Sequence, residues 1–112
     1  MFPSTQRLGR SDFAEYFAVG RRFHYPYATV VYVPRPTLRV AVVVGKKVSK
    51  QAVERNRLRR RVYAAVRQGV DHSPTVMTGV FIIILKPAAA AATRHDLRAA
   101  VFDMFAQIVH SG

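Results

Sequence analysis

The chain has 112 residues, enough for one domain, and half of them are hydrophobic, which argues against an intrinsically disordered protein. Eighteen Lys and Arg against six Asp and Glu give a formal charge of +12, and we expect a polyanionic partner, with nucleic acid ahead of an anionic membrane surface. There is no Cys, which excludes disulfides and thiolate metal sites, and the longest apolar run, Val80 to Leu85, is too short to cross a bilayer. The N-terminus shows no signal-peptide pattern, so we expect a cytoplasmic protein without a membrane role.

The first helix is predicted to carry an aromatic face. Residues 1–10 lack a pattern and are expected to form a loose N-terminal arm, after which Ser11 is a candidate N-cap. Gly20 is placed to end the helix. The aromatic residues recur at i, i+3 and i+4, namely Phe13, Tyr16 and Phe17.

Two strands should follow. Tyr27 to Val33 is rich in β-branched and aromatic residues, and Pro34 stops it. Leu38 to Val44 is almost entirely apolar, which is typical of a central strand. Because only a few residues join the two runs, we expect an antiparallel hairpin.

The main helix is predicted from about Lys50 to Gln68, with Ser49 as its cap. Its apolar face consists of Leu58, Val62, Ala65 and Val66. Its opposite face should carry Asn56, Arg60, Tyr63 and Arg67. Residues 69–79 show turn residues without periodicity and are predicted to form a loop.

Val80 to Lys86 is the third predicted strand, and its position after a long helix favours parallel pairing. The alanine run 88–92 would be a linker or a frayed turn. Thr93 and Asp96 resemble a capping box for a C-terminal helix whose apolar face holds Leu97, Val101, Phe105 and Ile108. The order α-β-β-α-β-α predicts an α+β fold, a small sheet packed with helices in a single domain over 1–112.

Positive charge is concentrated in one segment. Residues 46–67 hold nine of the eighteen cations and one acid, Glu54. Like charges this close together on a helix repel one another, and bound phosphates would neutralise them. Each Arg can bind one phosphate through two hydrogen bonds. The alternative is a solvated face that only aids solubility. The nine cations are Lys46, Lys47, Lys50, Arg55, Arg57, Arg59, Arg60, Arg61 and Arg67.

No motif indicates catalysis by the side chains. Gly45-Lys46 lacks the other elements of a phosphate-binding loop, the four His share no metal-ligand spacing, and the six acids form no catalytic pair. The aromatic face of the first helix is open to two interpretations. Phe13, Tyr16 and Phe17 could be core residues, or some of them could line a groove where unstacked bases lie on the rings.

Two segments together resemble the signature of the bacterial ribonuclease P protein family. They are Val44-Gly45-Lys46-Lys47-Val48-Ser49 and the run from Ala52 through Arg55-Asn56-Arg57-Leu58-Arg59-Arg60. Weaker similarities at Asp12-Phe13, at Phe17 and at Phe81 to Pro87 extend the resemblance over roughly residues 7–110. The chain has Tyr63, Val80 and Val30 where many members have Arg, Asp and an aromatic residue.

The resemblance implies a fold like a domain of ribosomal protein S5, with a left-handed βαβ crossover that breaks the usual rule. It implies a protein subunit that binds a catalytic RNA and the 5′ leader of precursor tRNA. That RNA would remove the leader by endonucleolytic hydrolysis with Mg²⁺, and the protein alone would not be catalytic. No protein partner would be required. The alternative is a ribosomal or other structural RNA-binding protein without a nuclease role.

The resemblance also implies roles for particular residues. Phe13 and Phe17 would lie in the leader-binding cleft, with the Lys46-Lys47 step beside it. Asn56 could also lie near a metal ion, although no metal ligand is identified. The whole set predicted to bind RNA, from charge and resemblance together, is Lys46, Lys47, Lys50, Arg55, Asn56, Arg57, Arg59, Arg60 and Arg67.

Overall fold

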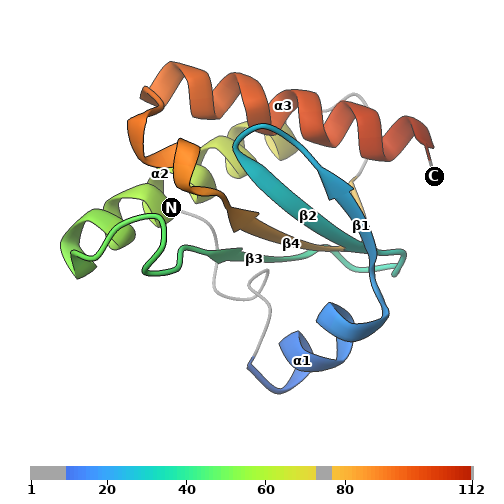
Figure 1. Ribbon diagram of the computed structural model, residues 1–112. Coiled ribbons are helices and arrows are strands. Elements are labelled where there is room, and N and C mark those ends of the chain that lie inside the picture. Colours follow the sequence, from blue (N-terminus) through green and yellow to red (C-terminus); the bar gives the residue numbers. More distant parts are fainter. Residues whose placement is uncertain (1–9, 73–76, 112) are drawn as a thin grey trace.

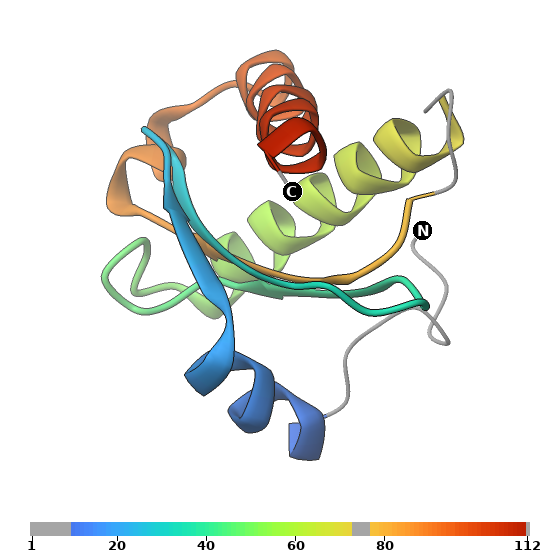
Figure 2. The same ribbon diagram turned by 90° about the vertical axis from the view of Figure 1, so that its right-hand side faces the viewer.

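A four-stranded mixed sheet lies between helices in the computed structural model, which describes residues 10–72 and 77–111 (Figure 1). The strands are β1 (Arg21–His24), β2 (Ala28–Val33), β3 (Arg39–Val43) and β4 (Val80–Leu85). The helices are α1 (Arg10–Val19), α2 (Ala52–Asp71) and α3 (Arg94–Ser111), with a short 3-10 helix, η2 (Pro87–Ala91), before α3. Seen along the sheet, α1 covers one face, and α2 and α3 cover the other (Figure 2). The α+β class is therefore confirmed.

The predicted hairpin is wrong, because β4 inserts between its two strands. The order in the sheet is β1-β2-β4-β3. Ile83 of β4 lies opposite Val30 of antiparallel β2 on one side and opposite Val42 of parallel β3 on the other. The parallel pairing of the third predicted strand is confirmed, but β4 is central and β3 lies at an edge. The apolar composition of β3 predicts a buried strand and not its place in the sheet, because helices on both faces of the sheet bury an edge strand as well. The left-handed sense of the β3-α2-β4 crossover stays a prediction.

The sequence pattern did not reveal β1. Its four residues, Arg-Arg-Phe-His, are mostly exposed and carry no run of β-branched residues. The strand forms because a tight turn returns the chain onto β2, with the Tyr25 N–H donating to the Ala28 carbonyl at 2.9 Å. The strand lies at the open edge of the sheet, where charged residues discourage pairing with other chains.

Alternation along the strands divides the core into two layers. On the α2 and α3 side, Phe81 is fully buried and meets Phe105 edge-on at 5.0 Å between ring centroids. The same layer holds the four predicted apolar residues of α2 and those of the C-terminal helix, which confirms both faces. The smaller layer consists of Val31, Val33, Ala41, Val80 and Ile82, against which the aromatic residues of α1 pack.

Three predicted boundaries were displaced. Helix α1 already includes Arg10 and Ser11, so Ser11 is not its cap, and the rest of the predicted arm lies outside the described residues. Helix α2 begins at Ala52 after Gln51, and the Ser49 hydroxyl accepts the Gln51 N–H at 3.2 Å, so Ser49 lies before the cap position. This helix also runs on to Asp71, into the predicted loop, of which residues 73–76 are not described.

The other helix-end predictions are confirmed. The Gly20 N–H donates to the Tyr16 carbonyl at 2.9 Å as α1 ends. At the start of α3, the Asp96 N–H donates to the Thr93 hydroxyl at 3.0 Å, and the Thr93 N–H donates to the Asp96 carboxylate at 3.3 Å. This is the predicted capping box, with Asp in place of Glu. The alanine run is neither linker nor frayed turn, because it forms η2 and buries Ala89.

Candidate RNA interface

The turn between β3 and α2 presents the Lys-Lys step to solvent. The Val48 N–H donates to the Gly45 carbonyl at 3.1 Å, which closes a turn with Lys46 and Lys47 exposed at its tip. Lys50 is exposed just before α2. The Arg55 guanidinium donates to the Ser49 carbonyl at 3.0 Å, so the first turn of α2 holds the basic turn beside it.

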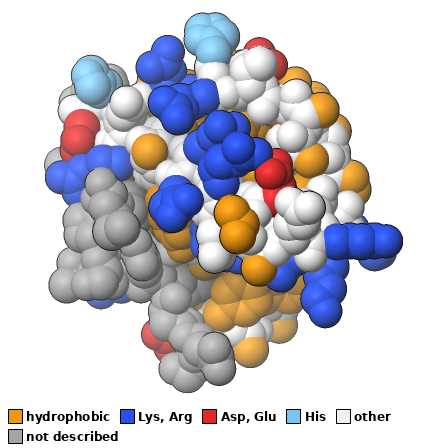
Figure 3. Space-filling model, turned by 90° about the vertical axis from the view of Figure 1, so that its left-hand side faces the viewer, with side chains coloured by type: hydrophobic (Ala, Val, Ile, Leu, Met, Phe, Trp, Pro, Cys, Tyr) orange, Lys and Arg blue, Asp and Glu red, His pale blue; other side chains and the backbone are white. Residues whose placement is uncertain are grey.

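The motif residues of α2 form a partly self-paired basic surface. Arg57 lies 2.6 Å from the Glu54 carboxylate, and Arg59 donates to the Asn56 side-chain oxygen at 2.6 Å. Arg60 is exposed and has no hydrogen-bond or ion-pair partner in the described part of the chain. Lys and Arg side chains gather on the corresponding face of the molecule, with few acids among them (Figure 3). The structure thus collects most of the predicted RNA-binding residues on one side.

Arg67 and Tyr63, both predicted on the face of α2 opposite its apolar residues, have partners within the protein. Arg67 lies 3.1 Å from the Asp71 carboxylate one turn later on α2. Tyr63 was predicted to lie with Asn56 and Arg60 on the exposed face, and this is wrong. It is half-buried against the larger core layer, and its hydroxyl accepts the Val42 N–H of edge strand β3 at 3.2 Å. The aromatic residue that replaces a family Arg therefore links α2 to the sheet.

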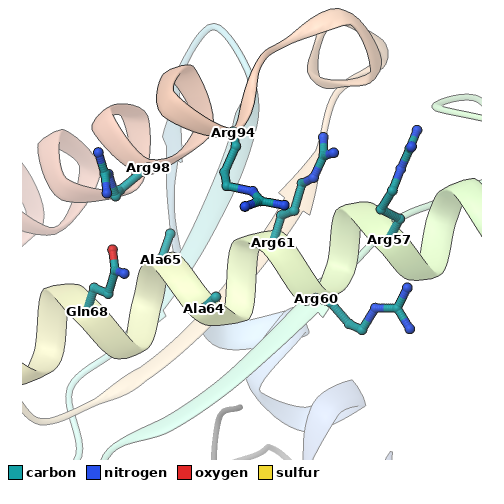
Figure 4. Close-up of a pocket in the computed structure, with 8 residues that line it drawn as sticks. All are labelled: Arg57, Arg60, Arg61, Ala64, Ala65, Gln68, Arg94 and Arg98. Carbon is teal, nitrogen blue, oxygen red and sulfur yellow. The ribbon is translucent and has the colours of Figure 1, made fainter.

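A groove of about 400 Å³ lies between α2 and α3 (Figure 4). Helix α2 contributes three Arg, and α3 contributes Arg98 and Arg94, of which Arg94 extends toward α2. Three of these Arg, Arg61, Arg94 and Arg98, were not among the predicted RNA-binding residues. The signal for the α3 pair was their i, i+4 spacing, which places both on one side of a helix. The groove is lined by Arg57, Arg60, Arg61, Ala64, Ala65, Gln68, Arg94 and Arg98.

The aromatic side of α1 lies on the opposite face of the sheet. Phe13 and Phe17 stack at 5.7 Å between centroids, and both are half-buried against the smaller core layer. Arg22 lies 4.5 Å from the Phe17 ring and donates to the Phe17 carbonyl at 3.2 Å. Each ring therefore has a buried part and an accessible part, and the leader-binding role of both stays a prediction.

A second cavity, of about 260 Å³, opens beside α1. Tyr16 lines it, with Arg35 above the ring at 5.3 Å, and neither predicted Phe does. Val80, where the family often has Asp, lines the same cavity. Val30, aligned with a family aromatic position, points into the larger core layer, so it cannot contribute to a groove on the α1 side.

A metal ion near Asn56 stays a prediction. Among the residues whose side chains are described, no group of three His, Asp or Glu side chains could hold a metal ion. Near the motif, the Asn56 oxygen already accepts a hydrogen bond from Arg59. Among these same residues, no helix is long and apolar enough to span a membrane.

Comparison with known proteins points to one family. A family model described as Ribonuclease P matches residues 2–109. The ribonuclease P protein component of Parasynechococcus marenigrum is 34% identical over 110 residues, covering 85% of this chain and 86% of the relative. That of Microcystis aeruginosa is 35% identical over 95 residues, covering 78% and 77%.

Solved structures agree at the level of the fold. The ribonuclease P protein from Thermotoga maritima superposes with a TM-score of 0.75 at 22% identity, covering 88% of this chain and 93% of that chain. The one from Staphylococcus aureus superposes with a TM-score of 0.72 at 19% identity, covering 93% and 94%.

Proposed function

The chain belongs to the ribonuclease P protein family, and as the protein subunit of that endoribonuclease it works with an RNA subunit; we propose that it binds this RNA through α2 and holds the 5′ leader of precursor tRNA beside α1. One observation carries the proposal. Lys46 and Lys47 of the turn are exposed, as are Asn56, Arg57 and Arg60 of α2, while the apolar side of α2 is buried in the core. The core thus orients the cations toward a partner.

We further propose that the catalytic centre and the Mg²⁺ ions belong to the RNA. The described side chains offer no group of three metal-ligating residues, and no motif in the sequence indicates catalysis by the side chains. What this chain supplies is counter-charge and orientation. Exposed Arg and Lys can neutralise phosphates where two RNAs approach each other, and aromatic rings can stack on single-stranded bases.

A binding experiment tests the proposal against the alternative of a general structural RNA-binding protein. The affinity of the protein is measured for the ribonuclease P RNA of its own organism and for a ribosomal RNA fragment of equal length, at one fixed salt concentration. We expect clear preference for the ribonuclease P RNA. Equal affinities would favour the alternative, because charge alone binds both RNAs alike.

A further inference from the structure

Five Arg residues line the groove between α2 and α3, and its lining contains no acid. Arg57 has Glu54 as a partner outside the groove, at 2.6 Å. Arg60, Arg61, Arg94 and Arg98 have no hydrogen-bond or ion-pair partner in the described residues. In Figure 4, Arg94 of α3 and Arg61 of α2 extend toward each other across the groove. Five Arg around one groove repel one another, so an anion bound there would be stabilised.

Arg61 gives a second, independent observation. Its Nε atom is buried and has no hydrogen-bond partner in the structure. A buried N–H without a partner costs free energy, and one on a charged group costs more. If the Arg61 side chain turns outward when an anion enters the groove, an acceptor oxygen of that anion can satisfy this N–H. The neighbouring Ala64 and Ala65 leave the space free, and Gln68 adds an amide at one end.

We propose that this groove holds a backbone phosphate of the ribonuclease P RNA, so that the RNA interface continues from α2 onto α3. The inference rests on the proposed function, and it adds Arg61, Arg94 and Arg98 to the residues that meet RNA. Arg57 and Arg60 belong both to the groove lining and to the predicted RNA-binding set, so the groove adjoins the proposed RNA surface of α2. The forked guanidinium matches phosphate oxygens, which favours a phosphodiester over a single carboxylate.

The first test uses variants of α3 that leave the α2 motif intact. Arg94 and Arg98 are both exposed, so Arg94→Gln and Arg98→Gln should fold normally, which thermal unfolding checks. We expect the double variant to bind the ribonuclease P RNA roughly tenfold more weakly, and its plot of log K against log salt to be flatter by about one unit. Arg21→Gln, an exposed cation on edge strand β1, is the control and should change affinity less than twofold.

The outcomes separate the inference from the function on which it rests. Wild-type affinity and salt dependence in the double variant would overturn the groove site while leaving the function intact. A wild-type protein that does not prefer the ribonuclease P RNA would instead contradict the function. Loss of precursor tRNA binding alone, with the ribonuclease P RNA bound normally, would assign the groove to the other RNA and overturn the inference.

A crosslinking experiment does not depend on changes in affinity. The chain has no Cys, so Ala64→Cys places a unique thiol in the groove for a short photoactivatable crosslinker. We expect crosslinks to the ribonuclease P RNA. Ala106→Cys, exposed farther along α3 and not part of the groove lining, is the matched control and should give few. Equal yields from the two positions would overturn the inference.

Discussion

Gly20 shows how one residue positions the aromatic helix. It follows α1, and only a residue without a side chain fits there. A Cβ at this position would overlap a methyl group of Val31 and lie 2.9 Å from the Tyr16 carbonyl. The sequence predicts Gly20 as a helix end, which is correct. The close approach of α1 to β2 depends on a neighbour eleven residues away, and no local pattern reveals it.

We expect Gly20→Ala to destabilise the protein. Overpacking at a tight contact costs about 1–3 kcal/mol of unfolding free energy. Gly45→Ala is the matched control, because a Cβ at Gly45 would meet nothing within 4 Å. Urea denaturation of both variants checks the prediction, and equal midpoints would show that α1 does not depend on the close approach.

Tyr63 replaces a family Arg, and we expect it to act in folding and not in RNA binding. Tyr63→Phe removes the acceptor for the Val42 N–H, and the free energy of unfolding should fall by about 1 kcal/mol. Affinity for the ribonuclease P RNA should stay within twofold. A stable variant with much weaker RNA binding would mean that the Tyr63 hydroxyl contacts RNA.

Phe13 and Phe17 can be separated by measuring two affinities and one stability. If a ring stacks on a leader base, Phe→Ala should weaken the binding of precursor tRNA by roughly 1–3 kcal/mol. The binding of mature tRNA, which lacks the leader, should hardly change. If the ring belongs to the core, truncation should lower the free energy of unfolding by roughly 3–5 kcal/mol and weaken the binding of both RNAs alike. We expect a mixed result, with Phe17 the more structural of the two. A folded Phe13→Ala variant with the wild-type preference for precursor tRNA would exclude stacking by Phe13.

At the scale of elements, the sequence predicts the helices well because their signals are local. The apolar stripe of α2 and the Thr93 and Asp96 box of α3 both lie within a few turns of the chain. Strand neighbours are set by contacts between distant segments. The insertion of β4 between β2 and β3, and the pairing of the polar strand β1, could therefore not be read from those segments alone.

The candidate site also divides into a part that the local sequence predicts and a part that depends on tertiary packing. The basic turn and the α2 motif lie within 22 residues, and the sequence identifies them. The groove needs Arg61 and Arg94 to face each other, and this depends on how α2 packs against α3. Charge clustering along the chain cannot show such a pair.

Helix α2 offers an internal comparison of two cations. Arg60 is exposed without a described partner, whereas Arg67 already lies against Asp71. We expect Arg60→Gln to flatten the dependence of log K on log salt by about one unit for the ribonuclease P RNA, and Arg67→Gln to flatten it less. Filter binding at several salt concentrations measures both slopes. A larger effect from Arg67 would mean that RNA displaces Asp71 and makes Arg67 a main contact.

At the scale of the whole molecule, the sheet separates two faces that are proposed to bind RNA. Figure 2 shows α2 and α3 on one face of the sheet and α1 on the other. The basic motif belongs to α2, and the aromatic residues of α1 pack on the smaller core layer. With the proposed sites, this separation would allow one small domain to hold the RNA subunit and the leader at the same time. In that arrangement, the net charge of +12 would reduce the repulsion between the two RNAs.

We propose that this charge assists cleavage by the partner RNA, and a Mg²⁺ titration tests that claim. Cleavage of precursor tRNA by the ribonuclease P RNA of the same organism is measured across Mg²⁺ concentrations, with and without the protein. We predict that the protein lowers the Mg²⁺ concentration needed for half-maximal cleavage, because its cations replace part of the counter-charge that Mg²⁺ otherwise provides. An identical Mg²⁺ requirement in the two titrations would contradict the claim.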